Sequence, residues 1–359
     1  MNYSMIIPTY NDAVRLRNSL EALKQVIVPE GASFEVIVVD DGSDMDTWAV
    51  IGNMDPNYDL EYLYYKRCEV SSRARARNKG IKKASGDILV FVDADIIVPP
   101  HYLQELERCY RFDPSCLVAG FRSQLQEEVA LEDVKSGRVF QKDYQIEKGL
   151  EPEERRKIFQ DLSYNAGAFR HPELYCLTCN LAAPRQAVQA CGGFDEDLLY
   201  WGVEDIELAF RLARKGIRIF FNDRHGVLHQ SHGPVKKKPE QQGGVNKVDY
   251  NADVFIRKHP GAFGLPDEQT RELFRHTAQH YTETEPRRED LPLQTVIDFD
   301  DPAALEETKK QILNLLARKD CRITVTDRAP QTDLDLWIQS AEQEAGLLKY
   351  YPCNHLSGM

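Results

Sequence analysis

The chain has 359 residues, of which 42% are hydrophobic and 28% are charged, a composition typical of a soluble globular protein. Lys and Arg total 45 against 57 Asp and Glu, and the resulting net charge of −12 argues against nucleic acid or an anionic lipid surface as a partner. No stretch approaches the roughly 18 apolar residues of a membrane span, and no export signal opens the chain, so we expect a cytoplasmic protein without an integral membrane segment.

Strands and helices alternate through the first 120 residues, which predicts an α/β fold with a Rossmann-like, mostly parallel sheet flanked by helices. The runs Val36–Val39 and Ile88–Val92 are continuously apolar and predict central strands buried on both faces. The predicted strands are 3–8, 34–39, 60–65, 88–93 and 116–121, and the predicted helices are 12–25, 44–53, 71–84 and 100–110. Ligands of such sheets bind outside the carboxyl ends of the strands, where we expect the polar residues to converge on one cleft.

The rest of the chain is less regular. A charged insertion of loops and short helices is predicted at 122–174, apolar character returns at 176–183, and a helix at 203–215 precedes a strand at 217–221. After a mobile basic loop at 233–244, the pattern predicts a helix at 246–258, a polar region at 267–291, strands at 294–299 and 321–326, and helices at 302–318 and 332–347.

These segments predict a main domain at 1–245, a helical connector at 246–292 and a small α/β unit at 293–359. No internal repeat is apparent in the sequence. The eight cysteines are scattered through a chain large enough to fold without disulfides, so we expect them to be reduced, and Cys176 and Cys179 lack the second pair that a zinc site needs. The oligomeric state is left open.

Asp93 and Asp95 follow a buried strand at positions i and i+2, so both carboxylates can address one point beyond the strand end. A hard divalent cation, Mn²⁺ or Mg²⁺, would bridge such carboxylates to a diphosphate. An isolated pair of this kind is more often a simple turn. The segment Asp40-Asp41-Gly42-Ser43 also allows two interpretations. It is either a simple turn or a loop in which one carboxylate accepts a hydrogen bond from a uracil N–H.

Glu204 and Asp205 open the helix at 203–215, where two acids either compensate the helix dipole or act on a substrate. Trp201 and Gly202 beside them favour the second reading, because an aromatic platform and a close approach would position an acceptor hydroxyl for a base. His229 and His232 are either surface histidines or supply one metal ligand after a strand, and we favour His229 as that ligand. The basic run 73–83 is either a partner for diphosphate or a set of helix residues facing water.

Several of these motifs, in this order over residues 3–232, resemble the family-2 glycosyltransferases of GT-A fold. The second half looks most like the chondroitin-polymerase and galactosyltransferase branch, in which the motif Trp-Gly-Gly-Glu-Asp marks the acceptor side. Val203 replaces the second glycine here, which narrows the space beside the catalytic acid. The motifs are Pro8-Thr9-Tyr10-Asn11, Asp40-Asp41-Gly42-Ser43, Ala76–Ile81, Asp93-Ala94-Asp95, Gly192–Asp195 and Trp201-Gly202-Val203-Glu204-Asp205.

The resemblance implies an inverting, metal-dependent transfer of a hexosyl or N-acetylhexosaminyl group from a UDP-sugar to an acceptor hydroxyl. Asp205, assisted by Glu204, would be the base, and a carboxylate at a helix N-terminus is expected to stay ionised at neutral pH. Trp201 and Gly202 would bind the acceptor, which is a glycan, a small molecule or a peptide. Asp95, His229 and Asp93 would hold the metal. The nucleotide sugar would contact Pro8, Thr9, Tyr10, Asp40, Asp41, Arg77, Asp93, Ala94 and Asp95.

Three other functions compete with this interpretation. A nucleotidyltransferase or an NAD-dependent enzyme needs a glycine-rich phosphate loop after its first strand, which Pro8-Thr9-Tyr10-Asn11 does not provide. A non-catalytic module that binds nucleotide sugars would keep the same fold and the same acids, and the sequence leaves it open.

Overall fold

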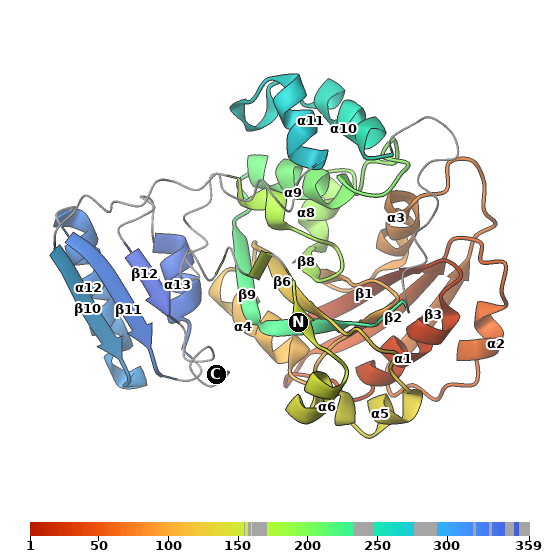
Figure 1. The fold of residues 1–359 in the computed structure, drawn as a ribbon, viewed down its shortest axis with the longest axis horizontal. Coiled ribbons are helices and arrows are strands. Elements are labelled where there is room, and N and C mark those ends of the chain that lie inside the picture. The colour runs from red at the N-terminus through yellow and green to blue at the C-terminus, as the bar shows by residue number, and fades with distance from the viewer. Residues whose placement is uncertain are drawn as a thin grey trace. The chain divides into compact units, whose positions relative to one another are not determined.

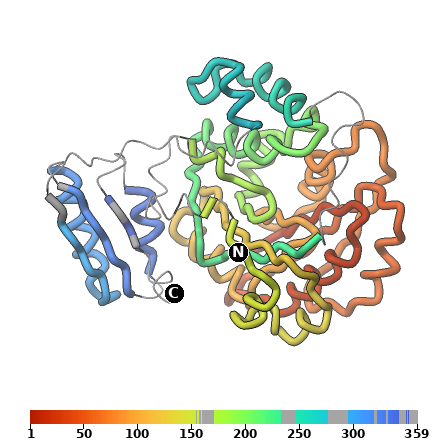
Figure 2. Tube along the Cα trace, viewed as in Figure 1, coloured from red at the N-terminus to blue at the C-terminus, as the bar shows by residue number. Residues whose placement is uncertain are grey.

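The computed structural model describes residues 1–153, 155, 156, 159, 171–232, 247–275, 293–318, 321–329, 332–341 and 348–351. The chain divides into two compact units, Met1–Glu153 with Glu173–Thr277 and Glu154–Pro172 with Ala278–Met359, each described separately below (Figures 1 and 2). The predicted loop at 233–244, and parts of the segments 122–174, 267–291 and 332–347, lie outside the described residues.

The first half of the main unit follows the predicted alternation of strands and helices. Its elements are β1 (Asn2–Thr9), α1 (Ala13–Leu23), β2 (Ser33–Asp40), α2 (Thr47–Ile51), β3 (Asp59–Tyr64), α3 (Arg73–Lys83), β4 (Ile88–Phe91), β5 (Ile96–Ile97), α4 (Tyr102–Phe112) and β6 (Leu117–Gln124). Val36–Val39 in β2 are completely buried and Ile88–Phe91 in β4 nearly so, which confirms that these are central strands.

The second half of this unit contributes shorter elements and two long ones. They are α5 (Leu131–Lys135), η1 (Arg138–Phe140), α6 (Lys142–Glu147), β7 (Glu151–Pro152), η3 (Pro172–Tyr175), β8 (Leu181–Pro184), α8 (Arg185–Ala190), α9 (Glu204–Arg214), β9 (Ile219–His229), α10 (Lys247–Lys258), η4 (Ala262–Gly264) and α11 (Asp267–Arg275). No helix among the described residues combines the length and the apolar character needed to cross a bilayer.

The described strands of this unit form one sheet in the order β3-β2-β1-β4-β8-β6-β9-β5, with β7 paired to β6. β1, β2, β3 and β4 are mutually parallel, and β6 runs parallel to β9. β8 is antiparallel to both of its neighbours, β4 and β6. The sheet is therefore mixed, and the α/β fold with flanking helices is confirmed (Figure 1).

α10 packs on α11 and on α9 through aromatic rings. The ring of Phe255 in α10 lies 5.4 Å from that of Phe210 in α9 and 4.9 Å from that of Phe274 in α11. His259, just after α10, also meets the buried Glu207 of α9, Nε2 to Oε1 2.9 Å. The segment predicted as a connector therefore contains a helix fixed to the one that carries Glu204 and Asp205.

The C-terminal unit contains a three-stranded parallel sheet in the order β10-β11-β12. Its elements are β10 (Leu293–Phe299), η5 (Pro302–Ala304), α12 (Leu305–Arg318), β11 (Cys321–Asp327), α13 (Leu334–Ala341) and β12 (Leu348–Tyr351). Its core includes Ile297, Ile312, Ile323, Val325 and Ile338, all less than a tenth exposed.

The C-terminal unit repeats the first five elements of the main unit, β1-α1-β2-α2-β3, strand for strand. Asp40 ends β2 and Asp327 ends β11, and both are completely buried. The tyrosine of the third strand donates to each carboxylate, Tyr62 Oη to Asp40 Oδ2 at 2.8 Å and Tyr350 Oη to Asp327 Oδ2 at 2.6 Å. In both sheets this tyrosine pairs with the residue two positions before the aspartate.

The backbone next to these aspartates is also equivalent. Asp41 N donates to Thr9 O at 3.0 Å, and Arg328 N donates to Phe299 O at 2.7 Å. Arg328 thus stands where the main unit has Asp41. The two units therefore share topology and the geometry of one turn, although no repeat is apparent in the sequence. The likeness is carried by strand register and one Asp–Tyr pair, which leave almost no trace in residue identity.

Candidate active site

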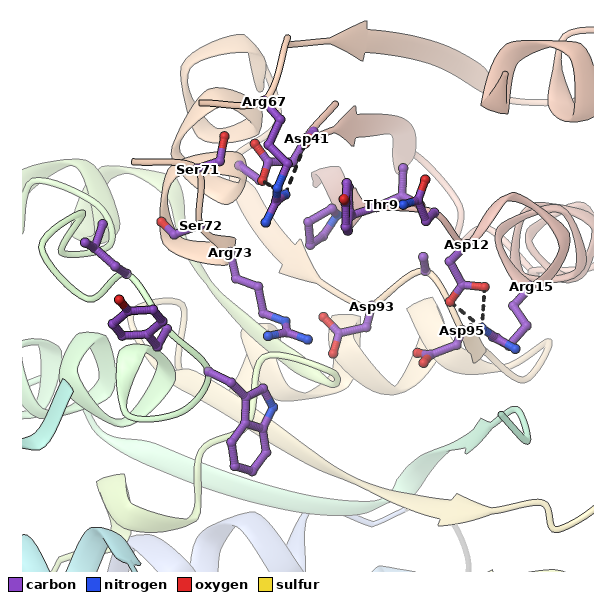
Figure 3. A pocket seen from close by; sticks show the side chains of 18 of the residues that line it. Thr9, Asp12, Arg15, Asp41, Arg67, Ser71, Ser72, Arg73, Asp93 and Asp95 are labelled. Carbon is purple, nitrogen blue, oxygen red and sulfur yellow. Dashed lines mark hydrogen bonds and ion pairs between the residues drawn. The ribbon is translucent and has the colours of Figure 1, made fainter. Parts of the chain in front are cut away.

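Three strand ends of the main unit enclose a cavity of about 820 Å³ (Figure 3). It lies beyond β1, β2 and β4, as expected for an open α/β sheet. The lining residues are Pro8, Thr9, Tyr10, Asn11, Asp12, Arg15, Asp41, Arg67, Ser71, Ser72, Arg73, Ala76, Asp93, Ala94, Asp95, Leu199, Tyr200, Trp201, His232 and Lys247. The predicted convergence of the polar strand ends and of Trp201 on one cleft is confirmed.

Asp40 and Asp41 are adjacent but differ in what they contact. Asp40 accepts from Ser43 N at 2.7 Å as well as from Tyr62, so both of its carboxylate oxygens hold the turn. Asp41 lines the cavity and pairs with Arg67, NH1 to Oδ2 2.8 Å. Burial raises the pKa of Asp41, although Ser71 and Arg67 oppose the rise. Of the two carboxylates, that of Asp41 can reach a ligand.

Gly42 follows at φ +78°, and a Cβ atom there would lie 2.4 Å from the backbone nitrogen of Arg67. Only glycine allows this close approach between the turn after β2 and the segment after β3. The approach brings the Arg67 guanidinium 4.0 Å above the Tyr10 ring, a cation–π contact at the cavity wall.

Asp95, His229 and His232 form a cluster that could hold a metal ion, with one ligand atom of each within 4.8 Å of the others. The pairing of β5 with β9 places His229 opposite Ile96, and Gln230 N donates to Asp95 O at 2.9 Å. Asp95 Oδ2 lies 2.8 Å from His232 Nε2 and 3.5 Å from His229 Nε2. Strand register therefore assembles the cluster from segments far apart in the chain.

The chemistry of this cluster fits a divalent cation. His229 Nδ1 donates to the Gln230 carbonyl at 3.0 Å, which leaves the Nε2 lone pair facing Asp95. Burial lowers the pKa of His229 although Asp95 opposes this, so the neutral ligand form is favoured. Burial acts to raise the pKa of Asp95, but the two histidines lower it below its usual range. The Oδ1 atom of Asp95 is buried and has no hydrogen-bond partner in the described structure. A metal ion could satisfy this oxygen.

Asp93, predicted as a further metal ligand, lies outside this cluster and pairs with Arg77, NH2 to Oδ1 2.9 Å. Arg77 also meets Glu204, NH1 to Oε1 3.3 Å. Arg77 is 1% exposed and does not line the cavity, so its guanidinium joins the strand end of β4 to the start of α9. The roles predicted for Asp93 and Arg77 in binding metal and nucleotide sugar stay predictions.

Asp205 is the second residue of α9 and accepts from Ile206 N at 3.0 Å, while part of its surface stays accessible. Burial and the neighbouring Glu204 charge raise the pKa of Asp205 to about 7, although Arg77 opposes the rise. The expectation that Asp205 is ionised throughout the neutral range is therefore wrong. The helix dipole is too weak to offset burial beside a second carboxylate.

The loop before α9 presents an exposed aromatic on a strained backbone. Trp201 is 64% exposed and lines the cavity. Gly202 has φ +91° and Val203 has φ +77° with ψ −28°. A β-branched residue in the left-handed region costs about 1–3 kcal/mol and persists only when its surroundings enforce it. Val203 thus holds a backbone conformation that glycine would adopt without strain.

The predicted site residues fall into two groups. Those that line the cavity are Pro8, Thr9, Tyr10, Asp41, Asp93, Ala94, Asp95 and Trp201. Those beside or beneath it are Asp40, Arg77, Gly202, Glu204, Asp205 and His229, of which Arg77 and Glu204 are ion-paired to each other and Asp205 is next in sequence.

Several lining residues were not among the predicted site residues, and two of them, His232 and Arg73, bear on the chemistry. His232 was as visible as His229, three positions away, but nothing in the sequence showed that both histidines face Asp95. Arg73 was one of many cations in the run 73–83. In the structure Arg73 lines the cavity and extends toward Asp93 (Figure 3), whereas Arg75 lines a separate small pocket of about 90 Å³ behind Asp41.

Comparisons with known proteins agree with this geometry. The family model "Glycosyl transferase family 2" matches residues 4–170, and the model "N-terminal domain of galactosyltransferase" matches residues 163–232. Together the two matches cover the strand ends, the loop with Trp201 and the histidines.

Among curated proteins, the chain is 30% identical over 276 residues to a validoxylamine A glucosyltransferase of Streptomyces hygroscopicus subsp. limoneus, which covers 72% of this chain and 56% of that protein. It is 24% identical to the Escherichia coli chondroitin synthase, over 68% of this chain and 36% of that one. The chain therefore spans little more than half of the first relative and about a third of the second.

Among solved structures, residues 1–349 of S. aureus TarS in complex with UDP-GlcNAc align with a TM-score of 0.51 at 16% identity, over 75% of this chain and 69% of that one. At this identity the likeness concerns the fold.

Proposed function

We propose that this chain, which belongs to glycosyl transferase family 2, transfers a hexosyl or N-acetylhexosaminyl group from a UDP-sugar to an acceptor hydroxyl with inversion. One observation carries the proposal. A single cavity is lined by Asp41, by Asp95 and His232 of the metal-type cluster, and by the exposed Trp201. These are the parts that a nucleotide, a diphosphate and an acceptor each require.

Asp41 is suited to the nucleoside, because it is an accessible acceptor at the end of β2 and can accept from the uracil N–H. Arg73 is suited to the diphosphate, since no described residue forms an ion pair with it and its side chain lies in the cavity. Asp95, His229 and His232 would hold Mn²⁺ or Mg²⁺. Such an ion, when bound, neutralises the charge that develops on the departing diphosphate.

The proposed chemical step assigns the base to Asp205, which stands at the start of α9 and is partly accessible. In its ionised form Asp205 accepts the proton of the acceptor hydroxyl, and the acceptor oxygen forms a bond to the anomeric carbon. The bond from that carbon to the UDP oxygen breaks, and UDP departs with the electron pair. One displacement of this kind inverts the anomeric configuration. The acceptor is a glycan, a small molecule or a peptide.

A panel of UDP-sugars tests this function, beginning with UDP-glucose because the validoxylamine A relatives are named as glucosyltransferases. We expect one sugar nucleotide to raise the melting temperature in the presence of Mn²⁺, by mass action on the folded state. The same compound should release UDP slowly when water acts as acceptor. Stabilisation with no UDP release from any sugar nucleotide would instead indicate a binding module without turnover.

A further inference from the structure

The loop that carries Trp201 is held by one side chain from another element. Asn251, on α10, is completely buried, and its Nδ2 donates to Tyr200 O at 2.9 Å and to Gly202 O at 2.6 Å. Tyr200 N donates back to Asn251 Oδ1 at 3.3 Å. The amide thus grips the residues on both sides of Trp201, while the indole itself stays exposed in the cavity.

The segment that Asn251 holds includes the strained backbone of Val203. Gly202 and Val203 have consecutive positive φ angles, and the Val203 carbonyl accepts from Glu207 N at 2.8 Å to begin α9. A valine left to itself would relax out of the left-handed region. Relaxation would rotate the peptide that precedes Glu204 and Asp205, so the fixed carbonyl of Gly202 opposes it.

We infer that Asn251 is a positioning residue for the acceptor side of the transfer. By fixing the carbonyls at 200 and 202, it enforces the strained backbone of Val203, aims Trp201 into the cavity, and sets the direction in which Asp205 leaves the helix. The inference rests on the proposed function for its catalytic part. Its structural part, the coupling between Asn251 and Val203, stands independently of any activity.

A double-mutant cycle over Asn251→Ala and Val203→Gly tests the coupling. Glycine adopts the left-handed backbone without strain. The hydrogen bonds from Asn251 should therefore matter less to the conformation of the loop when residue 203 is glycine. We expect N251A to speed amide hydrogen exchange in residues 199–206 by about tenfold in the Val203 background. In the V203G background the same substitution should have less than about a third of that effect. Equal effects in both backgrounds would overturn the inference.

The catalytic part of the inference is tested by measuring the Mn²⁺-dependent release of UDP, with the sugar nucleotide that stabilises the parent chain as substrate. N251A should lower kcat by about 10- to 100-fold while the KM for the sugar nucleotide stays within about threefold, because the donor site is untouched. The loss should again shrink in the V203G background. A change confined to KM would overturn the positioning role.

Two further variants separate this role from general stability. Asn251→Asp keeps the size and the acceptor for Tyr200 N but replaces the donor to both carbonyls, so it should reproduce the N251A effects in a chain that folds. Asn222→Ala removes another completely buried amide, on β9, that has no contact with the loop. N222A should leave exchange at 199–206 and kcat within about threefold of the parent, and a loss equal to that of N251A would overturn the inference. If the parent releases no UDP, the proposed function fails, and the exchange measurements still decide whether Asn251 holds the loop.

Discussion

Arg77 and Glu204 form a buried ion pair, NH1 to Oε1 3.3 Å, between positions 127 residues apart in the chain. Because Arg77 also binds Asp93, a single guanidinium joins the cavity wall to the helix that bears Asp205. Both carboxylates lose a charge partner if the guanidinium is removed, and an unpaired buried charge such as that of Glu204 is costly. Asp93 and Glu204 are therefore fixed relative to one another.

Asp205→Asn should abolish transfer without loss of folding. Removing a general base lowers kcat by about 10²–10⁴-fold, whereas UDP affinity should be unchanged because Asp41 and the Asp95 cluster are intact. The pKa of Asp205 is raised from its ordinary value of 3.8 to about 7, so this carboxyl lowers the stability of the parent progressively as the pH rises from 3.8 to 7, and the full cost is present above pH 7. The variant should therefore melt higher than the parent at pH 8, and the difference should shrink as the pH falls and vanish below 3.8. Full activity in D205N would remove Asp205 from the mechanism.

The rate of UDP release should depend on pH through Asp205. The base must be ionised, so kcat should fall about tenfold per pH unit below a midpoint near 7. Glu204→Gln removes the charge that helps to raise this pKa, and the midpoint should move down by about one unit. Glu61→Gln, in an exposed ion pair with Lys83, is the matched control and should leave the profile in place. An unmoved midpoint in E204Q would show that another group limits the rate.

The metal ligands can be separated from Asp93 by titration with Mn²⁺. Asp95→Asn and His232→Ala should each weaken Mn²⁺ binding by about 10- to 100-fold, measured by calorimetry in the presence of UDP. Asp93→Asn should change this affinity by less than about threefold, since Asp93 faces Arg77 and lies outside the cluster. His101→Ala, an imidazole that contacts only the Arg224 carbonyl in the described structure, serves as control. The reverse order of effects would restore Asp93 as a ligand.

Arg73→Ala should weaken the binding of UDP by about 10- to 100-fold, because charge-assisted contacts with phosphate contribute about 1.5–3 kcal/mol each. Arg17→Ala removes an exposed arginine of α1 that does not line the cavity, and UDP affinity should then be retained. The difference should shrink at high salt. Equal affinities of R73A and the parent would place the diphosphate elsewhere.

Tyr350→Phe should destabilise the C-terminal unit by about 1–3 kcal/mol, because the buried Asp327 loses a hydrogen-bond donor. Hydrogen exchange in β11 and β12 should rise while the UDP affinity of the chain stays constant. Tyr62→Phe removes the equivalent bond to Asp40 and should disturb the β2 turn beside Asp41, so UDP binding should weaken as well. Loss of UDP binding in Y350F would show that the C-terminal unit takes part in the donor site.

Much of this architecture could be predicted from the sequence, because local patterns encode it. The apolar runs at Val36–Val39 and Ile88–Val92 identified the central strands, and the acids after them identified the cleft. Features that depend on the pairing of distant segments could not be predicted. The register of β5 against β9, which brings His232 to Asp95, leaves no signal in either segment.

The contacts and the pKa of each carboxylate also could not be predicted from the sequence. Adjacent acids such as Asp40 and Asp41 look equivalent, yet Tyr62 and Ser43 engage one and the cavity exposes the other. The same is true of Asp205, whose pKa depends on burial and on the distance to Glu204 rather than on its place at a helix start. Asn251 carried no motif at all, because its partners are backbone atoms.

The matching order of elements in the two units allows the turn at Asp40 and Asp41 to be compared with a second turn in the same polypeptide. Asp40 and Asp327 both end a central strand and accept from the tyrosine of the third strand, whereas the next position holds Asp41 in one unit and Arg328 in the other. The buried carboxylate is common to both turns, which assigns it to the geometry of the turn itself. The position after it carries opposite charges in the two turns, so this geometry does not require Asp41, in agreement with the ligand contact proposed for it.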